Sequence, residues 1–135
     1  MLILRHTNGN EIHVCHTSCA IQDGGTLTSY LQQVATWVSA NPNDIISFII
    51  VNIDNLAPTS FASSFATAGL EQYAFTPDSA TLTVSQWPTL GSMVDSGKRV
   101  VVFMDNSADF TSVPWIIDQF TNMFEDAYGG SWRSK

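Results

Sequence analysis

Two histidines and two cysteines lie within nine residues near the start of the chain, in the stretch EIHVCHTSC at positions 11–19. Imidazole and thiolate groups bind zinc, and two thiols can form a disulfide, so this cluster is the first place to look for chemistry. A structural zinc site usually draws on a second pair of ligands elsewhere. The chain has no further cysteine and only one other histidine, His6, so zinc is disfavoured.

Cys15 and Cys19 are the only cysteines of the chain, and a spacing of four residues is feasible for a disulfide in a turn. Such a bond requires an oxidising compartment. Two reduced, buried thiols explain the same residues equally well. The sequence therefore makes this pair a disulfide candidate and leaves its state open.

His16 lies just past the end of a short strand pattern, where a loop begins. In such a strand His13 and Cys15 face one way, while Val14 and His16 face the other. An imidazole gives or takes a proton near neutral pH, so His16 is a candidate acid or base. A single histidine in that place is more often only structural, and the residues around it must decide.

The elements that position this cluster follow from the apolar patterns. NGN at 8–10 predicts a turn between the first two strands, and Thr26 predicts a helix cap before a stripe of apolar residues at 3.6-residue spacing. The patterns predict strands at 1–5, 11–15, 45–54 and 98–109, and helices from Thr26 to the NPND turn, at 58–70, at 89–97 and at 112–127.

The alternation of strands and helices predicts an α/β fold with a parallel sheet. Polar residues follow the strands, and the carboxyl ends of parallel strands form the working edge of such sheets. We expect this edge to carry Arg5, His16, Asn52, Asp54 and Asp105. A complete (β/α) barrel needs about 250 residues, so the pattern alone leaves a small open sheet or part of a barrel.

The composition of the chain excludes some classes of function. The chain carries a net charge of −7 with five Lys and Arg, so it has no basic stripe for nucleic acid. No apolar run is long enough to span a bilayer; the longest is IISFIIV at 45–51. The N-terminus shows no basic segment, apolar segment and cleavage site in series, so we expect no signal peptide.

Several strings resemble the phosphatidylinositol-specific phospholipase C family, in particular its secreted fungal branch of phospholipase C-like phosphodiesterases. They are EIHVCHTSC, the segment GGTLTSYLQQVATWVSANPNDIISFIIVNID, and WPTLGSMVDSGKRVVVFMDNSAD. The resemblance covers roughly positions 2–126; NPND and DSGKRVVVFMD are its specific parts. It implies a (β/α) TIM-barrel type of fold, here a partial barrel over 1–126, with an irregular tail at 127–135.

The resemblance also implies a chemistry. Family members hydrolyse phosphoric diesters of lipids with two histidines: one is the base for the inositol 2-hydroxyl, and the other is the acid for the leaving alcohol. His16 matches the acid. Arg5 stands where calcium-dependent members carry an acid, so it is expected to hold the phosphate without a metal or other cofactor. Asn52, Asp54 and Asp105 are expected to bind substrate.

The family's first histidine belongs to a strand before MLILR, and this chain begins after it. We therefore expect the chain to be inactive or nearly so, although its family acts on phosphatidylinositol-like or glycosylphosphatidylinositol-like substrates outside the cell. Exposed barrel edges would favour self-association. The alternatives are a non-catalytic module that binds a sugar or lipid headgroup, and a small open-sheet protein whose resemblance is fortuitous.

Overall fold

The computed structural model describes residues 2–6, 11–16 and 19–123. The predicted turn at 8–10 and the predicted irregular tail at 127–135 lie outside these residues. Along the chain the elements are β1 (Leu2–His6), β2 (Ile12–Cys15), β3 (Asp23–Thr26), α1 (Leu27–Ala40), β4 (Ile46–Asn52), α2 (Pro58–Thr67), η1 (Glu71–Tyr73), η2 (Val84–Gln86), α3 (Leu90–Ser96), β5 (Val100–Met104), β6 (Ile116–Asp118) and α4 (Gln119–Asn122).

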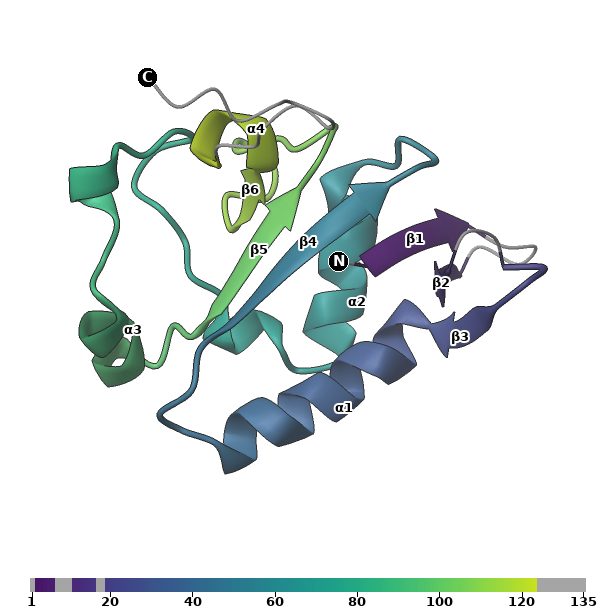
Figure 1. Ribbon diagram of the computed structural model, residues 1–135, viewed down its shortest axis with the longest axis horizontal. Coiled ribbons are helices and arrows are strands. Elements are labelled where there is room, and N and C mark those ends of the chain that lie inside the picture. The colour runs from purple at the N-terminus through teal and green to yellow at the C-terminus, as the bar shows by residue number, and fades with distance from the viewer. Residues whose placement is uncertain (1, 7–10, 17–18, 124–135) are drawn as a thin grey trace, which may run out of the picture.

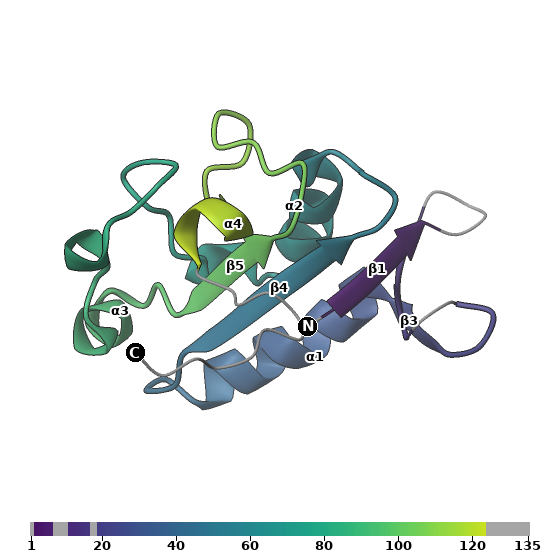
Figure 2. The same cartoon turned by 45° about the horizontal axis from the view of Figure 1, so that its top comes forward.

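The strands form one mixed sheet in the order β3-β2-β1-β4-β5-β6 (Figure 1). Strands β1, β4, β5 and β6 are parallel, whereas β1, β2 and β3 pair in antiparallel fashion. The arrows of β1, β4 and β5 point the same way in Figure 2. The α/β class is therefore as expected, with a parallel sheet extended by an antiparallel meander.

The expected partial barrel of TIM type is wrong for the described residues, which form an open sheet with β3 and β6 as its edges. A (β/α) barrel continues with parallel strands on both sides of each strand. Here the free side of β1 is taken by β2, which runs antiparallel to it. The hairpin thus ends the parallel run at β1.

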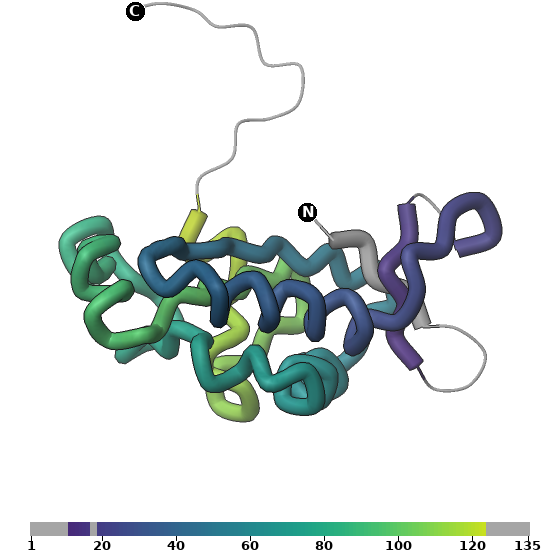
Figure 3. Tube along the Cα trace, turned by 90° about the horizontal axis from the view of Figure 1, so that it is seen from below, coloured from purple at the N-terminus to yellow at the C-terminus, as the bar shows by residue number. Residues whose placement is uncertain are grey.

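The first helices form where capping and apolar spacing place them. Thr26 caps α1, because its hydroxyl accepts a hydrogen bond from the backbone N–H of Ser29 at 3.2 Å. Leu27, Leu31 and Val38 lie on one side of α1 and are buried. Helix α2 begins with Pro58, which suits the first helical position. The two helices pack against each other on the same face of the sheet, as Figure 3 shows from below.

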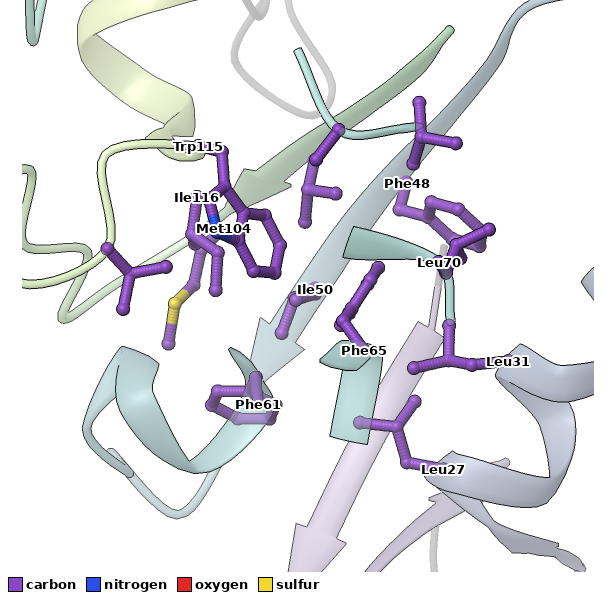
Figure 4. Packing of buried hydrophobic residues seen from close by; sticks show 14 of the residues in the cluster. Leu27, Leu31, Phe48, Ile50, Phe61, Phe65, Leu70, Met104, Trp115 and Ile116 are labelled. Atoms are coloured by element: carbon purple, nitrogen blue, oxygen red, sulfur yellow. The ribbon is translucent and has the colours of Figure 1, made fainter. Parts of the chain in front are cut away.

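The main core lies between the sheet and helices α1 and α2 (Figure 4). Phe65 of α2 is its centre: its ring stands edge-on to Phe48 of β4, with centroids 6.0 Å apart, and lies 5.1 Å from Trp115. A smaller cluster, Met93, Val101, Phe103 and Ile117, covers the other face beneath α3. Both faces of β5 are therefore buried.

The predicted final helix at 112–127 is wrong in its first half. Ile116 and Ile117 instead belong to strand β6, which pairs with β5. As a strand, this segment sends Ile116 into the main core and Ile117 into the smaller cluster, and both become almost fully buried. A helix could not fill both clusters with adjacent residues. Up to residue 123, where the described part of the chain ends, the short α4 follows, and positions 124–127 of the predicted helix lie outside the described residues.

Candidate functional site

The carboxyl edge of β4 and β5 is built by a network of amides around Asn52. This side chain is 1% exposed. Its Oδ1 accepts from the N–H of Leu56 and its Nδ2 donates to the carbonyl of Leu56, both at 2.9 Å. Asp105 Oδ1 accepts from the Asn52 N–H at 2.9 Å and from Asn106 Nδ2 at 3.0 Å. The network closes the turn after β4 and ties it to β5.

Asn52 is therefore a residue that shapes this edge, and an Asn52→Ala variant is expected to lose about 2–3 kcal/mol of unfolding free energy. The change leaves both backbone groups of Leu56 without the amide that binds them. Urea denaturation measures the effect. The exposed Asn43→Ala is the matched control, with an expected change within about 0.5 kcal/mol. Equal effects of the two changes would contradict a structural role for Asn52.

The three predicted substrate-binding residues lie together at this edge. Asp105 follows the end of β5 and is half-buried, and Asp54 is exposed two residues beyond the end of β4. Asn52 itself is enclosed by its network. Of the three, Asp54 is exposed and Asp105 is half-buried, so these two have surface at this edge.

Arg5 and His16 lie toward opposite ends of the β1–β2 hairpin. Leu4 is the register partner of both Asn52 on β4 and Val14 on β2. Arg5, one residue further along β1, is the partner of His13. His16 follows the end of β2, which is antiparallel, so it lies toward the start of β1. The structure therefore places His13, rather than His16, beside Arg5 at the carboxyl edge.

His13 forms a hydrogen bond with Asp23 of the neighbouring strand β3, and the two side chains form an ion pair when the imidazole is protonated. Its Nδ1 lies 3.0 Å from Oδ1 and 2.9 Å from Oδ2 of Asp23. The side chain of His13 is 19% exposed and that of Asp23 38%. Sequence reasoning missed this pair, since it took DGG at 23–25 only as a break between elements. An aspartate before two glycines, within reach of a strand histidine, is the signal that points to it.

The two glycines after Asp23 shape the pair. A Cβ on Gly24 would lie 2.9 Å from the carbonyl oxygen of Val14, so no larger residue fits there without movement. Gly25 has φ +88°, and its N–H donates to Asp23 Oδ1 at 2.8 Å. Gly24 thus lets β3 lie close to β2, and the Gly25 N–H holds one carboxylate oxygen of Asp23.

The pKa of the Asp23 carboxyl is lowered, first by the hydrogen bond from His13 and then by the one from the Gly25 N–H. Because the pKa of Asp23 is lower in the folded state, its contacts with His13 and Gly25 stabilise the folded chain at pH values above the unfolded pKa of about 3.9. That stabilisation is lost as the pH falls through the lower, folded-state value.

We expect the Gly25 amide resonance to report this titration in NMR spectra recorded from about pH 6 to about pH 2, with a midpoint below the ordinary aspartate value. His13→Val removes the largest cause, so the midpoint should move up in that variant. An unchanged midpoint would show that His13 does not hold the carboxylate in solution.

Cys15 and Cys19 are joined by a disulfide, with their Cα atoms 4.9 Å apart. The bond closes the start of the loop between β2 and β3. The backbone N–H of His16, inside this short ring, donates to the carbonyl of Gln22 at 3.1 Å. Both bonds fix the backbone on either side of His16, whose side chain is exposed.

A Cys19→Ser variant is expected to lose about 2 kcal/mol of unfolding free energy, the entropy of closing so short a loop. Urea denaturation with and without a reducing agent measures this. The reductant should lower the stability of the parent chain by a similar amount and leave the variant unchanged. A parent chain indifferent to reductant would contradict the expectation.

Among the described residues, no group of three or more His, Cys, Asp or Glu side chains is close enough to hold a metal ion. None of the helices in the described ranges has the length and apolarity needed to cross a membrane.

A polar pocket of about 340 Å³ opens between the start of β2 and helices α1 and α2. Besides the apolar Ile12, its lining is Glu11, Thr26, Thr28, Ser60, Ser63 and Ser64. Five hydroxyls and one carboxylate offer hydrogen bonds to a neutral polyol and repel an anion.

Comparison with known proteins gives one consistent result. The family model described as PI-PLC X matches residues 3–133. The chain is 38% identical over 125 residues to "PI-PLC X domain-containing protein 1" of Arthroderma benhamiae, covering 91% of this chain and 41% of that protein. It is 37% identical over 129 residues to an "Uncharacterized secreted protein" of the same fungus, covering 96% and 29%.

A plant protein extends the comparison. The chain is 30% identical over 106 residues to a PI-PLC X domain-containing protein of Arabidopsis thaliana, covering 73% of this chain and 24% of that protein. The chain thus spans less than half the length of each of these relatives. No solved structure matches it.

Proposed function

Because the chain belongs to the PI-PLC X domain family, we propose that it acts in the hydrolysis of phosphoric diesters of the phosphatidylinositol type. The observation that carries this proposal is the family match over residues 3–133, which includes both Arg5 and His16. In this proposal Arg5 and the two acids at the carboxyl edge bind a phosphate joined to a polyol, and His16, which lies toward the start of β1, is the acid that the family resemblance implies.

In this proposal Arg5 binds the phosphate. A guanidinium places two parallel N–H groups on two phosphate oxygens and offsets the negative charge that develops in the transition state. It needs no metal ion for that task. The chain has a net charge of −7 and therefore repels an anionic diester, so a positive group at the site is needed to attract one.

His16 is the general acid. As an imidazolium, it gives a proton to the oxygen of the leaving alcohol as the bond between that oxygen and phosphorus breaks. Exposure of its side chain suits a group that must meet a lipid substrate and regain a proton from water. Asp54 and Asp105, at the carboxyl edge of β4 and β5, accept hydrogen bonds from polyol hydroxyls in this proposal.

The experiment is a turnover assay on vesicles that contain phosphatidylinositol, with the 135-residue chain as the enzyme. Diacylglycerol is extracted and quantified, and ³¹P NMR identifies the water-soluble product. Attack by the 2-hydroxyl predicts a cyclic inositol phosphate as the first product. Vesicles of phosphatidylcholine are the matched control, since their headgroup has no hydroxyl placed for that attack. We expect turnover by this chain to be weak, and a chain that cleaves phosphatidylinositol no faster than phosphatidylcholine does not have the proposed activity.

The second candidate function is a module that binds a sugar or headgroup without turnover. The polar pocket beside α1 and α2 favours it, because its hydroxyls match a neutral polyol. Calorimetry with myo-inositol separates the two functions. Binding without cleavage, abolished by Ser60→Val but not by His16→Ala, would place the function in the pocket and remove the phosphodiesterase.

Secretion is part of the proposal. A disulfide persists in oxidising compartments, and one relative is named a secreted protein. A chain purified from the culture medium of its producing cells, with Cys15 and Cys19 oxidised, is the expected finding. A chain found inside the cells with Cys15 and Cys19 reduced would contradict secretion.

A further inference from the structure

We infer that the disulfide between Cys15 and Cys19 positions His16 and makes its action as the general acid depend on an oxidising environment. The inference rests on the proposed phosphodiesterase function and names the condition under which that function operates. The two cysteines are positioning residues, because they act through His16. Three features carry the inference: the anchoring of Cys15 in the sheet, the short ring that contains His16, and the unequal burial of the two cysteines.

Cys15 is the fixed end of the disulfide. It is the last residue of β2, and its register partners are Ile3 on β1 and Asp23 on β3. Its side chain is 4% exposed. Strands on both sides and burial of the side chain leave this residue little freedom to move. The group bonded to its sulfur is therefore held at a defined place relative to the sheet.

His16 lies inside the short ring that the disulfide closes. Its N–H donates to the carbonyl of Gln22 at 3.1 Å, which is the first restraint on its backbone. The second is the disulfide, because the chain after His16 must return to Cys19, whose Cα lies 4.9 Å from that of Cys15. The imidazole is exposed, so its position depends more on this backbone than a buried side chain would. Opening the disulfide removes the second restraint and leaves the first.

The second restraint affects the rate because proton transfer is sensitive to position. A general acid acts only within hydrogen-bond distance of the oxygen that it protonates. A displacement of about 1 Å can lower a catalysed rate by about 10²-fold. A loosened His16 occupies the productive position for a smaller fraction of the time. We therefore expect reduction to lower kcat with little effect on KM, since Arg5 lies on another strand and binds the diester in either state.

The two sulfurs differ in exposure, and this gives a reductant access to the bond. Cys19 is half-buried in a turn, whereas Cys15 is buried. A thiolate of a small dithiol attacks the Cys19 sulfur, the S–S bond breaks, and Cys15 leaves as a thiolate that takes up a proton. The second thiol of the reagent then releases Cys19. Two electrons pass to the protein, which ends with two thiols, and the reagent ends as a cyclic disulfide.

The consequence is that the reaction is confined to oxidising compartments. The cytosol keeps thiols reduced. A newly made chain with open cysteines therefore spares the phosphatidylinositol of the cell that produces it. The chain becomes active when the disulfide forms, which is the condition met outside the cell.

The test compares the oxidised and the reduced 135-residue chain on phosphatidylinositol vesicles. Dithiothreitol is expected to lower kcat about tenfold, and exchange into glutathione disulfide is expected to restore it. A double variant, Cys15→Ala with Cys19→Ala, is the control and should show the rate of the reduced chain with or without dithiothreitol. The ¹⁵N order parameter of His16 should fall from about 0.85 to below about 0.6 on reduction. That of Val102 in β5 should not change.

The outcomes separate the inference from the proposed function. A lower kcat that oxidation restores, together with a lower order parameter at His16, supports the inference. Unchanged kcat on reduction of an active parent chain overturns it and leaves the phosphodiesterase standing. A loss that oxidation does not restore, a loss with an unchanged His16 order parameter, or a reduced chain that circular dichroism shows to be unfolded also overturns it. A parent chain without turnover overturns the proposed function together with this inference.

Discussion

An Arg99→Met variant is expected to lose about 3–4 kcal/mol of unfolding free energy, a large part of the stability of a domain this size. Arg99 is 5% exposed. Its Nη1 donates to the carbonyls of Asn41 at 2.7 Å and Asp44 at 3.1 Å, and its Nη2 donates to Val38 at 3.0 Å. Methionine fills similar volume but donates nothing, so three carbonyls lose a donor, and only that of Asn41 keeps another, the N–H of Asp44.

The position of these carbonyls explains why a buried cation is tolerated there. They belong to the last turn of α1 and the turn that follows, where the helix dipole is negative. The guanidinium also lies 5.4 Å from the centre of the Tyr73 ring, which adds a cation–π contact. Arg99 thus ties the end of α1 to the start of β5, and its loss should loosen both.

Two matched variants sharpen the measurement. Arg99→Lys keeps the charge but cannot reach three carbonyls with a planar fork, so an intermediate loss of about 1–2 kcal/mol is expected. The neighbouring Lys98 is exposed and donates to the Gln72 carbonyl at 2.8 Å. Lys98→Met should change stability by about 0.5 kcal/mol or less. Urea denaturation measures all three, and equal losses for Lys98→Met and Arg99→Met would contradict this account.

A His16→Ala variant is expected to lose about 10²–10⁴-fold in turnover of phosphatidylinositol vesicles, the usual contribution of a general acid. The leaving alkoxide then has no donor and must take its proton from water. Stability should be unchanged, because the side chain is exposed. Initial rates of diacylglycerol release measure the first effect, and urea denaturation checks the second.

Gln22→Ala is the control for His16→Ala. Its side chain is exposed in the same loop, and the bond between Gln22 and the His16 N–H uses only the backbone carbonyl, which the change retains. Turnover within about twofold of the parent is expected. A loss in Gln22→Ala as large as that in His16→Ala would show that the rate depends on the conformation of the loop and not on the imidazole.

Local chemistry predicted much of the secondary structure. Thr26 and the apolar stripe after it define α1, Pro58 begins α2, and the apolar runs that include Ile46–Asn52 and Val100–Met104 are buried strands. Each follows from interactions between residues close in sequence, or from a run that is apolar on both sides. The same runs predicted that Asn52 and Asp105 meet at one edge, since parallel neighbours end together.

Pairing between distant segments decided the rest. Ile116 and Ile117 carry no periodicity that separates helix from strand; the free edge of β5 makes them a strand. The α/β pattern is equally compatible with a barrel and an open sheet. The sheet is open here because the antiparallel β2 occupies one side of β1, where a barrel would have a parallel strand. Periodicity does not record which strand lies beside which.

For the site, residue types and strand ends made His16 a candidate acid or base and predicted Arg5 and the acids at one edge, and the family resemblance gave their expected roles toward a phosphate ester. Only the tertiary structure put His13 beside Asp23 and opposite Arg5, and enclosed Asn52 in its own network. The physical reason is reach. A side chain's chemistry is fixed by its type, but its partners lie on other strands, and their identity depends on register and direction that the linear sequence does not contain.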